Sequence, residues 1–215
     1  MVKEKDSMNK FWEENKTTLL IISLIIILAI GAILYPKKPY PSVSAERLAE
    51  DPFLGAADAP FTIIEYGDFA CSSCKMWHWS GVLDEILELF DGQVKFVWRD
   101  NARLSTASIS AANAAQCAFD QGTFWEYHEL LFDNSRGFSN EGLKVYAVDL
   151  GLDSAQFNLC LDQGTYVNKV FHSMNLAGEN GLSVTPAFLV NDEVIIGPPP
   201  TSYLSDLITE KLNDG

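Results

Sequence analysis

Phe61-Thr-Ile-Ile-Glu-Tyr66, followed shortly by Cys71-Ser72-Ser73-Cys74, carries the strongest fold signal in this 215-residue chain. The first part is an apolar run typical of a buried strand, and the second opens a helical pattern that runs towards Phe90. Two cysteines at the first turn of a helix can close a small disulfide, and the unpaired amides and the positive end of the helix dipole stabilise a thiolate on the first cysteine. Because a thiolate attacks disulfides and a thiol does not, this placement predicts a redox site.

Half of a zinc site and a pair of unrelated buried thiols are the two alternatives to a redox motif at these cysteines. A structural zinc site needs four ligands, usually completed by a second C-x-x-C or an H-x-x-x-H. The sequence holds neither after Cys74. Redox chemistry is therefore favoured over metal binding, and we expect neither a metal nor a cofactor.

The segments around the motif predict an α/β arrangement. A helix over 72–90 and a strand over Val94–Arg99, with Asp91-Gly92 as the turn between them, complete a βαβ unit that is right-handed by expectation. Residues 105–180 then form a block of helices punctuated by glycines. The expected helices are 107–119, 123–132, 143–150, 155–161 and 166–177.

The C-terminal part predicts a hairpin and a helix. Two short apolar runs, Ala187–Val190 and Val194–Ile196, are separated by Asn191-Asp192, which is typical of a hairpin turn. A last helix is expected over Ser202–Leu212. The order of elements is therefore βαβ, a block of helices, then ββα.

The N-terminal part holds an almost unbroken apolar stretch without charge, Thr17–Tyr35. At about 1.5 Å rise per residue it spans a hydrocarbon core of roughly 30 Å, which predicts one transmembrane helix. Lysines are more frequent before this span than directly after it, so the positive-inside bias places the amino terminus in the cytoplasm and the rest of the chain outside. These lysines are Lys3, Lys5, Lys10 and Lys16 before the span, and Lys37 and Lys38 after it. A cleaved signal peptide, with Val43 and Ala45 as the small residues before the cut, is the alternative to an uncleaved signal-anchor.

The chain is thus expected to have four parts: a cytoplasmic segment 1–16, a transmembrane anchor 17–35, a linker 36–50 and a folded domain 51–215. Three prolines favour an extended linker. The folded part is long enough for one core with a sizeable insertion over about 105–180. The formal net charge of -14 argues against nucleic acid and against anionic lipid as partners.

Several ordered motifs of the folded part resemble the DsbA-like branch of the thioredoxin superfamily, most closely its membrane-anchored disulfide oxidoreductases. The motifs are Asp51-Pro-Phe-Leu-Gly55, Asp58-Ala-Pro60, Ile64-Glu65-Tyr66, Asp68-Phe69-Ala70-Cys71 and Gln121-Gly-Thr-Phe-Trp125. The resemblance covers the chain from about Asp51 to its end. It implies an α/β thioredoxin fold with an inserted all-helical domain, here preceded by the one N-terminal transmembrane helix.

The resemblance assigns roles to the residues of the paired-cysteine motif. Cys71 matches the family's nucleophile and Cys74 its more buried resolving thiol. During substrate oxidation, a substrate thiolate attacks the Cys71 sulfur, and a second substrate thiol resolves the mixed disulfide. Ser72 and Ser73 offer hydroxyls and amides near that sulfur, and each extra donor favours the thiolate and a more oxidising couple. The family's oxidants often carry His or Pro between the cysteines, and this chain carries neither.

Two elements outside the motif are also implied by the resemblance. Thr185-Pro186 matches the family's cis-proline element, which lies against the active-site cysteines, and this makes Thr185 a substrate-contact residue. Glu65 matches a buried acid below the disulfide, and a buried carboxyl has a raised pKa and can pass a proton to or from Cys74. The alternatives are an ordinary trans proline and a Glu65 turned to solvent.

Cys117 and Cys160 lie far apart within the helical block, each flanked by apolar residues. The simplest interpretation outside the cytoplasm is a structural disulfide that joins two helices. Two free buried thiols, or a second redox pair that relays electrons, are the alternatives.

Aromatic residues and histidines give weaker signals. Aromatic residues near helical spacing usually lie in a core, so only Phe69, Trp77 and His78 are expected at the rim of the active site. His128 and His172 show no pattern that indicates a metal site.

The sequence therefore predicts a membrane-tethered thiol:disulfide oxidoreductase that donates disulfides to thiol-containing exported proteins. Such an oxidant must be reoxidised, and the resemblance implies a membrane quinone-linked partner. A reductase or isomerase would use the same residues, although no dimerisation module precedes the thioredoxin half. A membrane-anchored metal-delivery module, with Cys71 and Cys74 as soft ligands, is an alternative of another class that would need an accompanying Met or His cluster.

Overall fold

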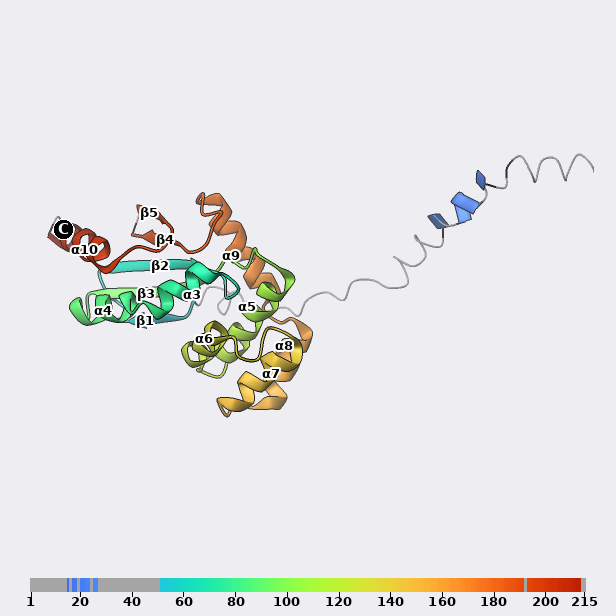
Figure 1. Cartoon of the computed structure of the whole chain (residues 1–215), viewed down its shortest axis with the longest axis horizontal. Coiled ribbons are helices and arrows are strands. Elements are labelled where there is room, and N and C mark those ends of the chain that lie inside the picture. The colour runs from blue at the N-terminus through green and yellow to red at the C-terminus, as the bar shows by residue number, and fades with distance from the viewer. Residues whose placement is uncertain are drawn as a thin grey trace, which may run out of the picture. The chain divides into compact units, whose positions relative to one another are not determined.

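The computed structural model describes residues 51–191 and 193–213, together with residues 15, 17, 18, 20–23, 25 and 26 near the amino terminus. The chain divides into two units, Met1–Pro39 and Tyr40–Gly215. Figure 1 shows the second unit as a sheet with helices around it. The elements and sites described below all belong to this second unit.

The predicted membrane span Thr17–Tyr35 falls largely outside the described residues, and those of its residues that are described are helical. None of the helices formed by described residues has both the length and the apolar character needed to cross a bilayer. The predicted segment 1–16, apart from Asn15, and the predicted linker 36–50 also lie outside the described part of the chain.

A five-stranded sheet with the order β1-β3-β2-β4-β5 forms the centre of the fold. Strands β2 (Phe61–Gly67) and β3 (Val94–Asp100) are parallel, β1 (Phe53–Gly55) is antiparallel to β3, and β4 (Ala187–Val190) is antiparallel to both β2 and β5 (Glu193–Ile196). The predicted βαβ and ββα halves therefore join along β2 and β4. Strand β1 is an addition to the predicted order.

Two helices follow β2 where the sequence pattern predicts a single helix over 72–90. α3 (Ser72–Trp79) ends at Trp79 with Ser80 as its C-cap, and α4 (Val82–Leu89) begins after Gly81, whose φ is 76°. Glycine adopts this left-handed conformation without a steric penalty, and the conformation interrupts the helix. Apolar residues of α4 remain buried against the sheet, so the hydrophobic pattern alone does not reveal the break.

Helices cover both faces of the sheet. On one face, α4 and α10 (Thr201–Asn213) contact each other and share a core cluster with Phe61. On the other face, Ala177 of α9 (Val167–Glu179) joins a cluster around Tyr66. Side chains alternate between the faces along a strand, which sends Phe61 and Tyr66 of β2 to opposite sides.

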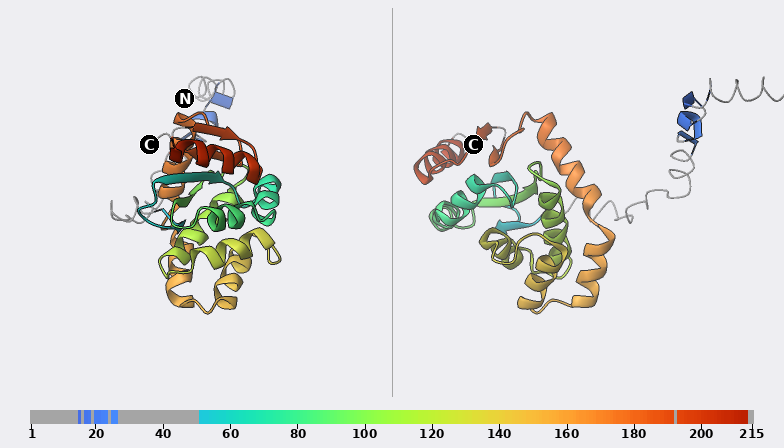
Figure 2. Two further views of the ribbon diagram at one scale, coloured as in Figure 1. Left: turned by 90° about the vertical axis from the view of Figure 1, so that its left-hand side faces the viewer. Right: turned by 45° about the vertical axis from the view of Figure 1, so that its right-hand side comes forward.

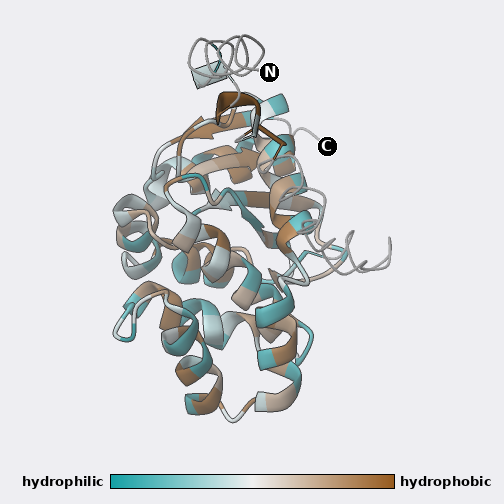
Figure 3. Cartoon of the chain, turned by 90° about the vertical axis from the view of Figure 1, so that its right-hand side faces the viewer, coloured by the Kyte–Doolittle hydropathy of each residue, from teal (hydrophilic) through white to brown (hydrophobic). Residues whose placement is uncertain are grey.

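Five consecutive helices between β3 and β4 form the predicted helical insertion. They are α5 (Thr106–Phe119), α6 (Phe124–Asp133), α7 (Asn140–Asp149), α8 (Ser154–Gln163) and α9, and they occupy 106–179 against the expected 105–180. Figures 1 and 2 show α6, α7 and α8 grouped beside the sheet and α9 running back along it. Polar and apolar residues share the helices of this group in Figure 3, as amphipathic packing requires.

Helix α5 is the centre of the insertion and contacts α6, α7, α8 and α9. Its buried face is rich in alanine, whose small side chain lets neighbouring helices approach closely. Cys117 of α5 forms a disulfide with Cys160 of α8, across a sequence separation of 43 residues. The closed loop contains α6 and α7, so the bond fastens the insertion together. The fold is the predicted α/β core with an all-helical domain inserted into it.

Candidate active site

The loop between β2 and α3 carries the paired cysteines, and Asp68 holds its shape. The buried carboxylate of Asp68 accepts the amide of Ala70 at 2.9 Å and the amide of Leu104 at 3.0 Å. Its backbone oxygen accepts the Cys71 amide at 2.9 Å. These bonds fix the loop to the segment that leaves β3, and they place Cys71 as the N-cap residue of α3.

Cys71 and Cys74 are both free thiols and differ in exposure. Cys71 is 9% exposed and Cys74 is fully buried. Burial raises the pKa of the Cys74 thiol well above its usual value, and the charge of Glu65 raises this pKa further. Cys74 is therefore held as a thiol at neutral pH, and Cys71 is the sulfur that a partner can reach.

The segment that precedes β4 lies against the Cys71 sulfur. The Cys71 thiol donates a hydrogen bond to the backbone oxygen of Thr185 at 3.3 Å, and Thr185-Pro186 is a cis peptide bond. Pro186 is buried, Thr185 is half-buried, and the neighbouring Val184 is 50% exposed. The start of α3 and the approach to β4, which are far apart in sequence, thus meet at one sulfur atom.

Glu65 lies in β2 and is electrostatically coupled to both cysteines. It is 3% exposed, and its Oε1 has no hydrogen-bond partner among the described residues. Burial raises the pKa of Glu65 well above its usual value, and the charge of Cys71 raises it further. The alternative in which Glu65 is turned to solvent is therefore wrong.

Ser72 and Ser73 form the first turn of α3, with Ser72 exposed and Ser73 half-buried. Within the described chain no side chain caps this helix end, which leaves its first amides available to a sulfur anion. The ammonium of Lys75 donates to the backbone oxygen of Asp133 at 3.2 Å and so ties α3 to α6.

An aromatic cluster supports the active-site loop from inside the core. Phe69 stacks on Trp98 with ring centroids 4.9 Å apart, and Trp98 meets His128 edge-on at 4.6 Å. Gly67 makes room for this packing, since a Cβ atom there would lie only 2.2 Å from the Trp98 ring. The position of the loop therefore depends on a glycine in β2 and a tryptophan in β3.

Phe69 and Trp77 do not lie at the rim of the site as predicted, because each is only 4% exposed. Trp77 points into the core and donates its indole N–H to the backbone oxygen of Pro199 at 2.9 Å. His78 is half-buried and stacks on Phe132 with ring centroids 5.0 Å apart. The large apolar side chains that remain exposed on the segments around the site are Met76, Trp79, Leu104 and Val184.

His128 of α6 has an environment that the sequence does not reveal. It is 3% exposed, and neither ring nitrogen has a hydrogen-bond partner among the described residues. Burial lowers the pKa of His128 well below its usual value, and the nearby His78 lowers it further, so the ring is neutral. The described part of the chain contains no group of three or more His, Cys, Asp or Glu residues that fits a metal ion. The aromatic pattern of α6 signals burial but not an unpaired imidazole.

The structure brings the predicted site residues together in two separate places. Cys71, Cys74, Glu65 and Thr185 converge at the start of α3. Cys117 and Cys160 are bonded to each other inside the insertion. Two free thiols at 117 and 160 are therefore excluded.

Residues 48–210 match a family model described as Thioredoxin. Among solved structures, a thioredoxin-like oxidoreductase from Silicibacter pomeroyi is 26% identical, with a TM-score of 0.67 over 80% of this chain and 99% of that chain. Oxidised BdbD from Bacillus subtilis is also 26% identical, with a TM-score of 0.70 over 81% of this chain and 97% of that chain.

The chain also matches part of much longer proteins. It is 33% identical over 150 residues to the Na(+)/H(+) antiporter NhaA 1 of Mycolicibacterium gilvum, a match that covers 67% of this chain and 24% of the antiporter. A second antiporter, from Herminiimonas arsenicoxydans, is 31% identical over 68% of this chain and 23% of its own length. The chain thus spans about a quarter of the curated relatives it matches. Because the family model matches most of the chain and the fold and the paired cysteines agree with it, this protein belongs to the thioredoxin family.

Proposed function

We propose that this protein is a thiol:disulfide oxidoreductase that introduces disulfides into exported proteins through Cys71 and Cys74. The observation that best supports this function is the contact between the Cys71 thiol and the Thr185 backbone oxygen, together with the complete burial of Cys74. This arrangement offers one sulfur to a protein substrate and reserves the other for closing the disulfide. Ion antiport is not assigned to this chain, which spans about a quarter of the antiporters it resembles.

The oxidation begins with the Cys71–Cys74 disulfide. A substrate thiolate attacks the Cys71 sulfur, the bond between the two enzyme sulfurs breaks, and Cys74 leaves as a thiolate that takes up a proton. A second substrate thiolate then attacks the substrate sulfur of the mixed disulfide, and Cys71 leaves as a thiolate. The substrate has lost two electrons, and the enzyme is left as the dithiol.

Glu65 handles the proton of Cys74 in this scheme. It is buried, coupled to both cysteines, and has an oxygen without a partner among the described residues. Since the raised pKa of Cys74 favours its thiol form, the leaving sulfur needs a proton at once, and its complete burial keeps it away from bulk water. A protonated Glu65 supplies that proton, and the carboxylate takes it back when Cys74 attacks.

The substrate binds in extended form beside Thr185. Its backbone pairs with the half-buried Thr185 in the manner of an added strand, which brings a substrate cysteine next to Cys71. The side chain of Val184, directly before Thr185, is apolar and exposed, and it suits the unfolded segments of a client protein.

The direction of the reaction is part of the proposal. The first amides of α3 have no side-chain cap among the described residues, and a helix N-terminus of this kind favours an anion, so a reduced enzyme with an anionic sulfur at this end acts as an oxidant of its substrates. Its electrons then pass to a membrane quinone-linked partner, which restores the disulfide.

The location follows from the N-terminal sequence. The apolar stretch Thr17–Tyr35 anchors the chain in the membrane, with the amino terminus in the cytoplasm and the folded domain outside. The disulfide between Cys117 and Cys160 supports an oxidising compartment for that domain, because such bonds are rare in the cytosol.

A measured reduction potential tests the direction. The full chain in detergent is equilibrated with glutathione buffers, and a Cys117→Ser/Cys160→Ser variant isolates the signal of Cys71 and Cys74. A reduction potential of about -120 mV, the value of DsbA, supports the oxidase function. A reduction potential of about -270 mV, the value of thioredoxin, would mean that the protein is a reductase.

A further inference from the structure

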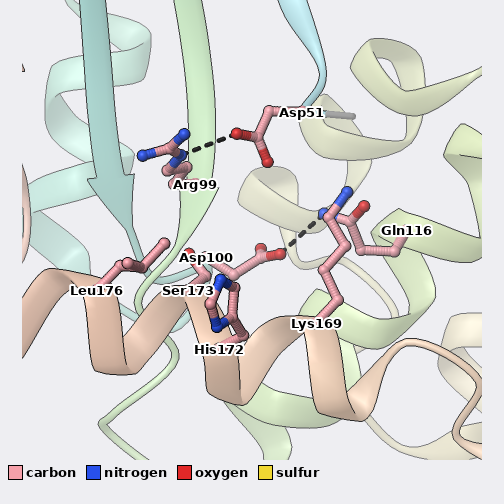
Figure 4. Close-up of a pocket in the computed structure, with 8 residues that line it drawn as sticks. All are labelled: Asp51, Arg99, Asp100, Gln116, Lys169, His172, Ser173 and Leu176. Carbon is pink, nitrogen blue, oxygen red and sulfur yellow. Dashed lines mark hydrogen bonds and ion pairs between the residues drawn. The ribbon is translucent and has the colours of Figure 1, made fainter. Parts of the chain in front are cut away.

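A cavity of about 220 Å³ lies between β3, α5 and α9, apart from the cysteine site. A cavity needs only roughly 10–15 Å³ to hold one water, so this space accommodates a small molecule. Figure 4 shows side chains of all three elements, and of Asp51, turned towards it. Cys71, Cys74, Glu65 and Thr185 do not line it.

Two polar atoms in the cavity lining lack partners within the described chain. Gln116 is 1% exposed; its Nε2 donates to Asp100 at 2.8 Å, and its Oε1 is unpaired. Ser173 is 8% exposed, and its Oγ is also unpaired. Buried polar groups are nearly always hydrogen-bonded, so each of these atoms indicates a partner that the described residues do not provide. Gln116 Oε1 can accept a hydrogen bond, and the Ser173 hydroxyl can donate one.

The charges of the lining are balanced. Arg99 pairs with Asp51 at 2.8 Å, and the buried Lys169 attracts the carboxylate of Asp100. A simple anion in the cavity would meet two carboxylates, and a simple cation would meet a guanidinium and an ammonium. A molecule that carries both charges, or neither, avoids these repulsions.

We propose that this cavity binds a small zwitterion of the α-amino-acid type. The ammonium end donates to Gln116 Oε1 and lies near the Asp100 carboxylate. The carboxylate end accepts from the Ser173 hydroxyl and lies near Lys169. Both unpaired atoms are then satisfied by a single molecule, and each end faces a group of opposite charge.

Calorimetric titration of the full chain in detergent tests this proposal, with glycine and L-alanine as probes. Acetate and methylammonium carry the two halves of the zwitterion separately, and glycerol is the neutral comparison. We expect saturable binding of glycine or L-alanine, weaker binding of both halves, and a rise of the melting temperature with zwitterion concentration. Equal binding of glycerol or of either half overturns the zwitterion assignment. Failure of both zwitterions to bind overturns the proposal.

Ser173→Ala is the diagnostic variant. Because Ser173 Oγ has no partner among the described residues, its removal leaves the fold as stable as before, whereas the affinity for the zwitterion falls roughly 10- to 150-fold, as expected for one lost hydrogen bond to a charged carboxylate. Ser202→Ala on the exposed side of α10 is the matched control and leaves the affinity unchanged. An unchanged affinity in Ser173→Ala contradicts the proposed contact.

A second variant fills the space. Ser173→Leu places an isobutyl group in the cavity and abolishes zwitterion binding, while thiol–disulfide exchange at Cys71 continues at the normal rate. Binding that survives in a folded Ser173→Leu protein excludes this cavity as the site. The exchange assay on the same sample separates the two proposals, since it reports on the cysteines alone.

Discussion

Glu65 and Asp100 are two buried carboxyl groups with different partners. Asp100 accepts hydrogen bonds from the Trp98 indole at 2.9 Å and from Gln116 at 2.8 Å, whereas Glu65 Oε1 has no partner within the described residues. Burial raises the pKa of both groups, and the two hydrogen bonds keep that of Asp100 at about 6. Glu65 is thus suited to proton transfer, and Asp100 makes stability depend on pH.

Glu65→Gln removes the proton carrier and keeps the shape of the side chain. We expect the step in which Cys74 resolves a mixed disulfide to slow roughly 100-fold, the lower end of the effect of general acid–base catalysts, and to lose part of its pH dependence. Stopped-flow fluorescence between pH 6 and 9 measures this step. Glu88→Gln on the exposed side of α4 is the control. An unaltered rate and pH profile in Glu65→Gln would remove Glu65 from the mechanism.

Asp100→Asn tests the pH dependence of folding. The folded-state pKa of Asp100 is about 6, above the usual 3.8, so the folded protein binds this proton more tightly than the unfolded chain does. The resulting contribution to the free energy of unfolding is fully present below the unfolded pKa and is lost as pH rises through about 6. The wild-type protein should therefore lose roughly 3 kcal/mol relative to Asp100→Asn between about pH 4 and pH 7. Urea denaturation across that range measures the difference. A constant difference between the two proteins would show that Asp100 titrates normally.

The close packing of strands β2 and β3 positions the active-site loop. The Trp98 ring occupies the space above Gly67, and Phe69 stacks on that ring two residues before Cys71. The loop therefore takes its place from packing between strands, in addition to the hydrogen bonds of Asp68.

Gly67→Ala should displace Trp98, because the new methyl carbon would lie 2.2 Å from the ring. We expect a loss of about 1–3 kcal/mol in the free energy of unfolding, with a changed tryptophan fluorescence. Gly178→Ala in α9 is the matched control: its new methyl group meets only Arg103 at 3.4 Å, and alanine favours the helix by up to about 1 kcal/mol. Equal stability of Gly67→Ala and the wild type would mean that β2 and β3 tolerate a wider separation.

The disulfide between α5 and α8 is predicted to affect the stability of the protein and not its redox activity. Cys117→Ala/Cys160→Ala opens a loop with a sequence separation of 43, which costs about 4 kcal/mol in the chain-entropy model. Guanidinium denaturation measures that loss. The reduction potential of Cys71 and Cys74 should stay the same in the variant. A shifted potential would instead favour the alternative of a second, electron-relaying pair.

In the intact cell, the proposed topology places both cysteine pairs, the redox pair and the structural disulfide, outside the cell or in the periplasm. After mild reduction of intact cells, a membrane-impermeant maleimide should label the chain, and Cys71→Ser should lose that label, because Cys71 is the more exposed thiol. A Cys74→Ser variant serves as control and should still be labelled. Labelling that requires lysed cells would place the domain in the cytoplasm.

Elements with local signals could be predicted from the amino-acid sequence. The paired cysteines, the apolar strand before them and the turn at Asn191 each have a signal in neighbouring residues, and the expected order of strands and helices is the observed one apart from β1 and the division of the helix expected over 72–90 into α3 and α4. Strand β1 has no local signal because it is three residues long and exists only through its pairing with β3. The break at Gly81 could not be predicted because the apolar pattern of a helix continues through it.

Features that depend on distant segments coming together could be known only from the folded structure. Thr185 reaches Cys71 across 114 residues, and the burial that shifts the pKa of Cys74 and Glu65 comes from the surrounding core. Phe69 and Trp77 are core residues, since exposure is a property of packing and not of residue type. The cavity of Gln116 and Ser173 likewise has no sequence signature, because its unpaired atoms come from α5 and α9, which meet only in the folded protein.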